Sequence, residues 1–183
     1  HHADAAFDAH KAEVPRTMVE LATCMHRNNC TTFYARSSPE THSSTNYPKW
    51  WSWAEANRTY ALSCLRSTRY EPYVVVPMRN STPWYDERFN GYGKNKIQFV
   101  MHLRYLGFRF NVLPRAFVTH MQHAKSELKN QWENALTHHR DNMDTLFKDF
   151  VVALHWKHRK TKKVPPCKQQ DHPGGDRWRG GKQ

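Results

Sequence analysis

Four landmarks between positions 70 and 125 decide the fold: YEPYVVVP (70–77), YDERFNGYGKNK (85–96), FRFNVLP (108–114) and FVTHMQHA (117–124). The first contains a short apolar run, residues 73–76, which predicts a buried strand. Residues 94–106 carry apolar side chains at helical spacing, and Gly107 is placed to end that helix. The third landmark alternates apolar and polar residues as a strand does, and residues 116–119 predict one more short strand. This alternation of strands and helices predicts a mixed α/β layer fold.

The flanking regions predict two further helices and a tail. Behind Pro15, apolar residues at helical spacing predict a helix that ends at Asn28. Residues 36–48 are rich in Ser, Thr and Pro and predict a loop. A long helix is predicted from about residue 126 to 157. Residues 158–183 combine basic residues, Pro and Gly with few apolar side chains, which predicts a basic disordered tail.

Charge and length set broad bounds on the function. The 183 residues suffice for one domain or part of one. Lys and Arg number 28 against 16 Asp and Glu, so the formal charge is +12. Such a charge fits either polyanionic partners or a solvated basic surface. No apolar run approaches the roughly 20 residues that a membrane span needs. Because the chain begins at His1 and shows no signal peptide, we interpret it as a piece whose targeting segment lies upstream.

Cysteines and glycosylation motifs indicate the compartment. Asn29, Asn57 and Asn80 each open an Asn-x-Ser/Thr triplet, and three such sites in a chain of this size favour a secretory lumen. The four cysteines contain no Cys-x-x-Cys pair, so their spacing fits no zinc motif. In that compartment Cys24 and Cys30 either pair or remain free buried thiols.

The landmarks, taken in order with the upstream segment STNYPKW (44–50), resemble the LARGE-type glycosyltransferases, the family that includes the Golgi β-1,4-glucuronyltransferase. The resemblance covers roughly residues 5 to 135. It implies a GT-A glycosyltransferase fold, of which residues 1–157 form the C-terminal, acceptor-side half, with the tail at 158–183. It also implies a Golgi-lumenal enzyme of type II topology, whose membrane anchor lies outside this chain.

The resemblance assigns a donor and metal site near the fourth landmark. His120 matches the family's metal-binding histidine, and imidazole is a good ligand for Mn²⁺ or Mg²⁺ when carboxylates complete the shell. The family's Asp-x-Asp pair occurs nowhere in these 183 residues, so the site is only half encoded and the chain alone is expected to be inactive. His123 and Lys125 are candidate contacts to the donor diphosphate. For each, a purely structural role is the alternative.

The acceptor side is expected around the second landmark. Candidate acceptor-binding residues are Asn46, Lys49, Trp50, Arg88, Tyr92, Gly93 and Asn95. Glycines flanking Tyr92 permit close backbone approach to a sugar, and the tyrosine ring offers a stacking face. Related enzymes hold an acidic general base where this chain has Asn95, so Asp86 is the candidate base. The alternative is that Asp86 serves only to pair with Arg88.

Three functions are open from the sequence. The first is a metal-dependent, inverting glycosyltransferase that moves a sugar, glucuronic acid by resemblance, from a UDP-sugar to a xylose-containing glycan or glycoprotein. The second is a non-catalytic glycan-binding module that retains only the acceptor half. The third, a basic nucleic-acid-binding protein, is not expected, because the basic cluster near residues 157–163 lies far along the chain from the tryptophans of residues 50–53.

Overall fold

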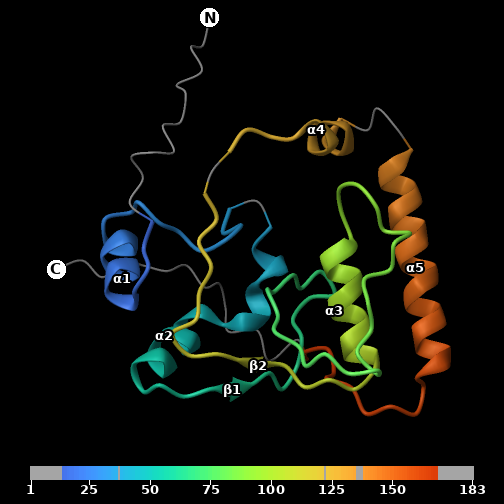
Figure 1. The fold of residues 1–183 in the computed structure, drawn as a ribbon, viewed down its shortest axis with the longest axis horizontal. Helices are drawn as coiled ribbons and strands as arrows, with labels where there is room; N and C mark the ends of the chain where they lie inside the picture. Colours follow the sequence, from blue (N-terminus) through green and yellow to red (C-terminus); the bar gives the residue numbers. More distant parts are fainter. Residues whose placement is uncertain (1–13, 37, 122, 135–137, 169–183) are drawn as a thin grey trace, which may run out of the picture.

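The computed structural model describes residues 14–36, 38–121, 123–134 and 138–168. Helices dominate these residues (Figure 1), and the single two-stranded sheet they contain pairs β1 antiparallel with β2. The elements in chain order are α1 (Met18–His26), η1 (Pro39–Thr41), η2 (Ser43–Thr45), α2 (Tyr47–Glu55), β1 (Tyr60–Ala61), α3 (Asn95–Tyr105), β2 (Asn111–Val112), α4 (Glu127–Glu133) and α5 (His139–Lys157).

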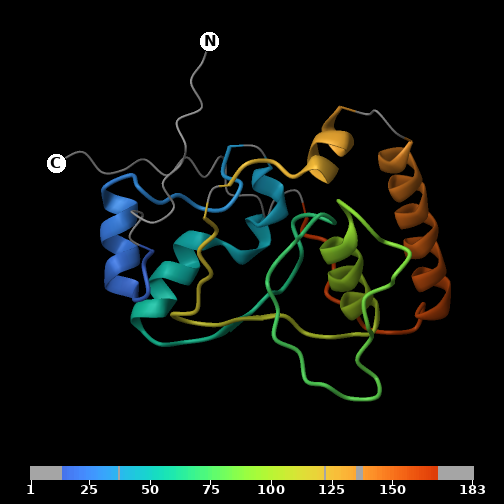
Figure 2. The same ribbon diagram turned by 45° about the horizontal axis from the view of Figure 1, so that its top comes forward.

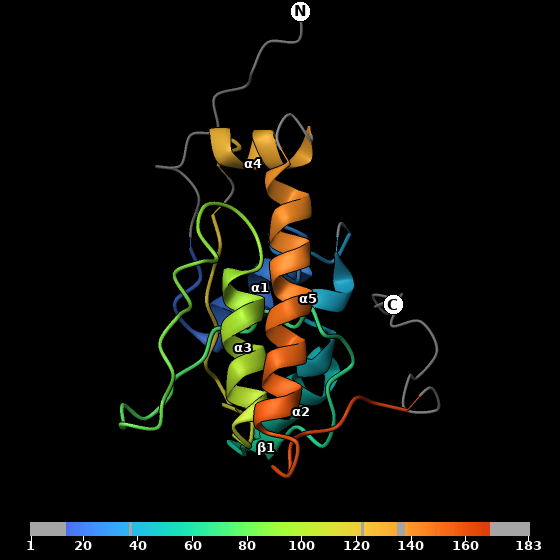
Figure 3. The same ribbon diagram turned by 90° about the vertical axis from the view of Figure 1, so that its right-hand side faces the viewer.

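Helix α3 lies at the centre, and seven of its eleven residues are buried, all of them apolar or aromatic except Gln98. Its residues 97–101 are all buried. Val100 packs into a first hydrophobic cluster with Trp50, Tyr60, Leu62, Leu65 and Tyr70. Met101 and Tyr105 pack into a second cluster with Phe89 and with Met143, Phe150 and Leu154 of α5. α3 and α5 accordingly lie side by side (Figure 3), and α3 joins the two halves of the core.

Two of the predicted helices are confirmed. α1 begins after Thr17, whose side chain accepts a hydrogen bond from the Glu20 N–H at 3.2 Å, and the chain turns at Asn28 with φ +58°. α3 ends at Tyr105, and Gly107 follows with φ +86°, the left-handed conformation expected of a glycine just past a helix end.

The prediction of strands at residues 73–76 and 116–119 is wrong for the chain as the structure describes it. Both segments are extended coil, and they are not buried: Val75 is 91% exposed and Val118 is 65% exposed. The alternating segment of residues 108–112 pairs only at Asn111 and Val112. A strand needs a neighbour for its N–H and C=O groups, and no described residues pair with either segment. The connection from β1 to α3 is therefore a long irregular loop (Figure 2).

The single helix predicted over residues 126–157 is in fact two. Ser126 caps α4, as expected, by accepting a hydrogen bond from the Lys129 N–H at 3.3 Å. α4 closes at Asn134, a weak helix former, and α5 begins at His139. α4 consequently lies across the N-terminal end of α5 and does not continue it (Figure 1).

The predicted tail is also corrected for its first part, residues 158–168. A disulfide joins Cys167 to Cys64, and the backbone of Leu65 bonds to Pro165 and Cys167 at 2.9 Å each. The Arg104 guanidinium donates to the Val164 carbonyl at 2.7 Å. Basic composition predicts disorder only when nothing anchors the segment, and here a covalent bond does. Residues 169–183 of the predicted tail lie outside the described residues.

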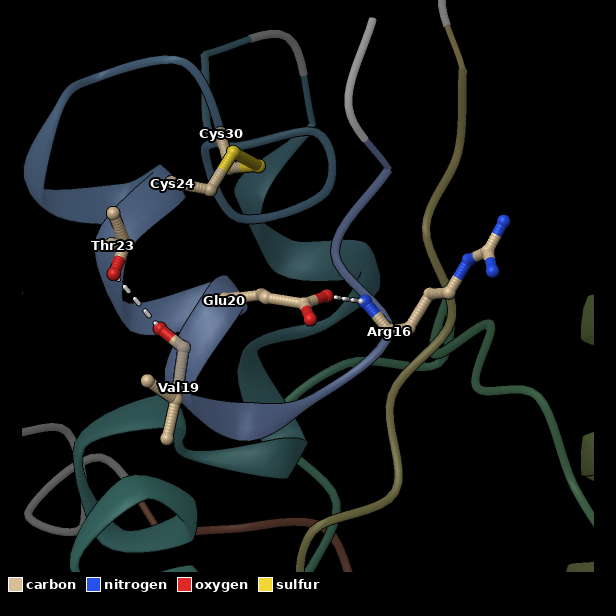
Figure 4. The surroundings of a disulfide bond; sticks show 6 residues. All are labelled: Arg16, Val19, Glu20, Thr23, Cys24 and Cys30. Carbon is tan, nitrogen blue, oxygen red and sulfur yellow. Dashed lines mark hydrogen bonds between the residues drawn. A yellow bond between two sulfur atoms is a disulfide. The ribbon is translucent and has the colours of Figure 1, made fainter.

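The second disulfide settles the alternative left open for Cys24 and Cys30, which are paired. It ties the C-terminal turn of α1 to the loop that follows (Figure 4). At the other end of this helix the Glu20 carboxylate accepts the Arg16 N–H at 2.7 Å, so both ends of α1 are fixed. No helix within the described ranges is long and apolar enough to cross a membrane.

Candidate functional site

A broad central cleft of about 3080 Å³ runs through the molecule. Its walls come from α1 and the loop after it, from residues 42–51, and from the extended segments 72–77 and 108–121. Asn46, Trp50, His120, His123 and Lys125 line it. The structure thus brings the predicted donor and metal residues to one wall, together with part of the predicted acceptor set.

His120 and His123 are exposed on this wall, with their ring centroids 5.2 Å apart. The Nδ1 atom of His123 lies 2.7 Å from the Ala124 carbonyl. Since a carbonyl only accepts, this Nδ1 carries the proton and Nε2 keeps the lone pair that a metal needs. No three His, Cys, Asp or Glu side chains in the described part of the chain gather closely enough to hold a metal. Two imidazoles alone do not complete a metal shell, so the ligand role of His120 stays a prediction.

The ring of Phe33 touches two histidines. Its centroid lies 5.0 Å from His120 and 5.0 Å from His42, in each case edge-on. His42 is buried, and burial, aided by the nearby charge of Lys96, lowers its pKa to about 4. His42 is accordingly neutral at physiological pH.

Lys125 is engaged by an ion pair. Its Nζ atom lies 2.5 Å from a Glu133 carboxylate oxygen, and Lys129 lies 3.9 Å from the other oxygen. The hydrogen bond from Lys125 holds the pKa of Glu133 below its usual range. Both partners are substantially exposed, so the pair is weak enough for Lys125 to exchange partners with an incoming phosphate.

The Gly91–Asn95 turn does not line the central cleft. Its second glycine, Gly93, is explained by packing against a neighbouring side chain. A Cβ at Gly93 would lie 2.6 Å from the Trp132 ring of α4, and the residue has φ +94°. Tyr92 meets the same indole edge-on at 5.9 Å. Burial, followed by its interaction with Tyr34, raises the pKa of Tyr92 to about 12. Asn95 begins α3, and its side chain accepts the Lys96 N–H at 2.8 Å.

Asp86 and Arg88 form an ion pair outside the cleft lining. The Arg88 Nη2 and Nε atoms lie 2.6 and 2.9 Å from the two Asp86 carboxylate oxygens, Oδ2 and Oδ1. The Asp86 N–H donates to the buried Gln98 side chain at 3.3 Å, which fixes the pair beside α3. Hydrogen bonding from Arg88 lowers the pKa of Asp86. The general-base role of Asp86 stays a prediction, although a lowered pKa weakens a base.

The residues around α2 have clear structural roles. Asn46 caps the helix by accepting the Lys49 N–H at 3.2 Å. The Lys49 ammonium lies 4.5 Å from the Tyr60 ring centroid and 4.8 Å from that of Trp53. Trp50 is buried, and its indole N–H donates to the Leu113 carbonyl at 3.0 Å. These contacts fix the floor beneath the central cleft.

Sequence reasoning missed Phe33, Tyr34 and Trp132 as members of this region. Trp132 lies within the helix predicted over residues 126–157, and no motif marks Phe33 or Tyr34. The three predicted glycosylation sites, Asn29, Asn57 and Asn80, are all exposed.

Comparison with known proteins finds one matching family and several relatives of this chain. A family described as "Glycosyl-transferase for dystroglycan" matches residues 5–159. The xylosyl- and glucuronyltransferase LARGE2 of Mus musculus is 36% identical over 140 residues, which is 76% of this chain and 19% of the relative. LARGE2 of Homo sapiens is 32% identical over 161 residues, 87% of this chain and 21% of the relative. The glycosyltransferase-like protein LARGE of Caenorhabditis elegans is 34% identical over 120 residues, 66% of this chain and 18% of the relative. The chain spans about a fifth of the length of these relatives.

Proposed function

Because this chain belongs to the family of glycosyl-transferases for dystroglycan, we propose that it forms the acceptor-side half of a GT-A catalytic domain that transfers a sugar from a UDP-sugar to a glycan. The observation that carries the proposal is the single wall of the central cleft that presents His120, His123 and Lys125 within the family-matched residues. The relatives' names support xylosyl or glucuronyl transfer, and we propose glucuronic acid as the donor sugar and a xylose-containing glycan as the acceptor.

In this proposal each residue on the wall has a task toward the donor. His120 would supply a ring nitrogen to Mn²⁺ or Mg²⁺, and His123 would offer its Nε2 beside it. A bound divalent ion would stabilise the charge that develops on the leaving diphosphate. Lys125 exchanges Glu133 for a phosphate oxygen as a point charge. Carboxylates from outside the described residues complete the metal shell.

The acceptor is proposed to approach from the Tyr92 side. Tyr92 is half-buried and offers part of its ring, and Asn95 is exposed at the start of α3, where backbone N–H groups favour a uronate or phosphate on the glycan. Lumenal localisation is also proposed. Its support is the two disulfides, which persist in oxidising compartments, and the three exposed glycosylation sites.

The test is a donor screen on the enzyme from the complete reading frame, measured as UDP release with and without Mn²⁺. We expect Mn²⁺-dependent release with one UDP-sugar. His120→Ala should abolish it, whereas the matched control His155→Ala, on the exposed face of α5, should retain it. Wild-type turnover by His120→Ala would refute the ligand assignment. Glycan binding without release from any donor would instead identify a non-catalytic binding module.

A further inference from the structure

We propose that Phe33 is a positioning residue that orients the His120 ring. The inference rests on the proposed function. Phe33 lies in the loop between α1 and η1.

Phe33 gives His120 its defined orientation. An exposed imidazole with no fixed neighbour samples several rotamers, and a metal ligand loses affinity when it does. Phe33 touches the His120 ring on one side and the buried His42 on the other, each at 5.0 Å. His42 is 6% exposed and anchored in the core, so it fixes Phe33, and Phe33 in turn limits the rotation of His120.

The loop that carries Phe33 is restrained at its two ends. On one side the Cys24–Cys30 disulfide holds it to α1, and the Cys30 N–H bonds to the Cys24 carbonyl at 3.2 Å (Figure 4). On the other side the Ser38 N–H bonds to the Tyr34 carbonyl at 3.1 Å, directly before η1. An aromatic side chain on a restrained loop can impose an orientation on its partner, which a loose loop could not do.

The first measurement uses the 183-residue chain without metal. Histidine ring-proton NMR resonances are assigned with His120→Ala and His42→Gln variants. The His120 resonances should shift in Phe33→Leu, because the ring current of Phe33 is removed, and return in Phe33→Tyr, which restores an aromatic ring. The exposed His155 should not move in either variant. Unchanged His120 resonances in Phe33→Leu would overturn the contact.

The second measurement uses the complete enzyme. Phe33→Leu should raise the Mn²⁺ concentration for half-maximal activity by about 10–100-fold, the usual effect of removing an outer partner of a metal ligand, and Phe33→Tyr should restore it. Tyr73→Phe, at an exposed tyrosine, is the control and should keep the wild-type Mn²⁺ requirement.

The outcomes separate the two proposals. If His120→Ala is inactive and Phe33→Leu keeps the wild-type Mn²⁺ requirement, the positioning role is refuted and the proposed function stands. If His120→Ala keeps its Mn²⁺-dependent activity, the ligand assignment fails, and the positioning role fails with it.

Discussion

His42 makes the stability of this protein depend on pH in a defined window. The buried neutral imidazole has a pKa of about 4, against 6.5 for an ordinary histidine. Between those values the unfolded chain binds a proton that the native protein does not, so stability falls as the pH falls from 6.5 towards 4. At about 1.4 kcal/mol for each pKa unit, acidification from pH 7.5 to 5.0 should remove about 2 kcal/mol of the free energy of unfolding.

The assay is urea unfolding followed by tryptophan fluorescence at both pH values, for the wild type and for His42→Gln. His102 also has a pKa lowered by burial and acts in the same direction, but it is present in both proteins and cancels in the difference. The wild type should lose about 2 kcal/mol more than the variant. Equal losses would mean that His42 is not the buried neutral group described here.

Three further predictions concern single positions. Gly93→Ala should destabilise the protein by about 1–3 kcal/mol in urea unfolding, because its Cβ would meet the Trp132 ring at 2.6 Å; a neutral change would show that α4 moves freely. Cys64→Ser opens a disulfide that spans 103 residues and should cost about 4.7 kcal/mol, against about 2 kcal/mol for Cys24→Ser, whose span is 6 residues; the reverse order in thermal unfolding would contradict the chain-entropy argument. Asp86→Asn should lower kcat by about 100-fold or more in the UDP-release assay if this carboxylate is the predicted general base; a kcat within about tenfold of the wild type would leave Asp86 only its ion pair with Arg88.

The helices could be predicted because their signals are local. α3 carries apolar residues at helical spacing with a glycine after its end, and α1 carries a Thr cap, so each boundary is set by residues within one turn. The prediction of strands at 73–76 and 116–119 was wrong because a strand depends on a partner that can lie anywhere in the chain. No described residues supply such a partner for either segment. The break before α5 shows the same limit, since a continuous apolar stripe does not reveal where one helix closes.

The candidate site shows the same difference between contacts that are local in sequence and contacts that are not. The His120 and His123 wall was found from a motif, since three residues of separation keep the two rings together. The grouping of Tyr92 with Trp132 and Tyr34 joins residues that lie tens of positions apart, and spacing alone holds no record of such contacts. The ion pair between Asp86 and Arg88 is an intermediate case. Because the two residues are only two positions apart, the sequence allowed this pair as an alternative to a catalytic role for Asp86.

The unequal spans of the two disulfides set an order for oxidative maturation during synthesis. At about 5–20 residues per second, Cys64 waits roughly 5–20 s before its partner has been translated. Throughout that interval an oxidant of the proposed lumenal compartment can join its thiol to any other free thiol already made. Cys24 and Cys30 emerge earlier and are only 6 residues apart, so their bond closes quickly and removes both from competition. Early closure of the Cys24–Cys30 disulfide thereby prevents mispairing, and Cys64 stays available to bond with Cys167 once Cys167 has been synthesised.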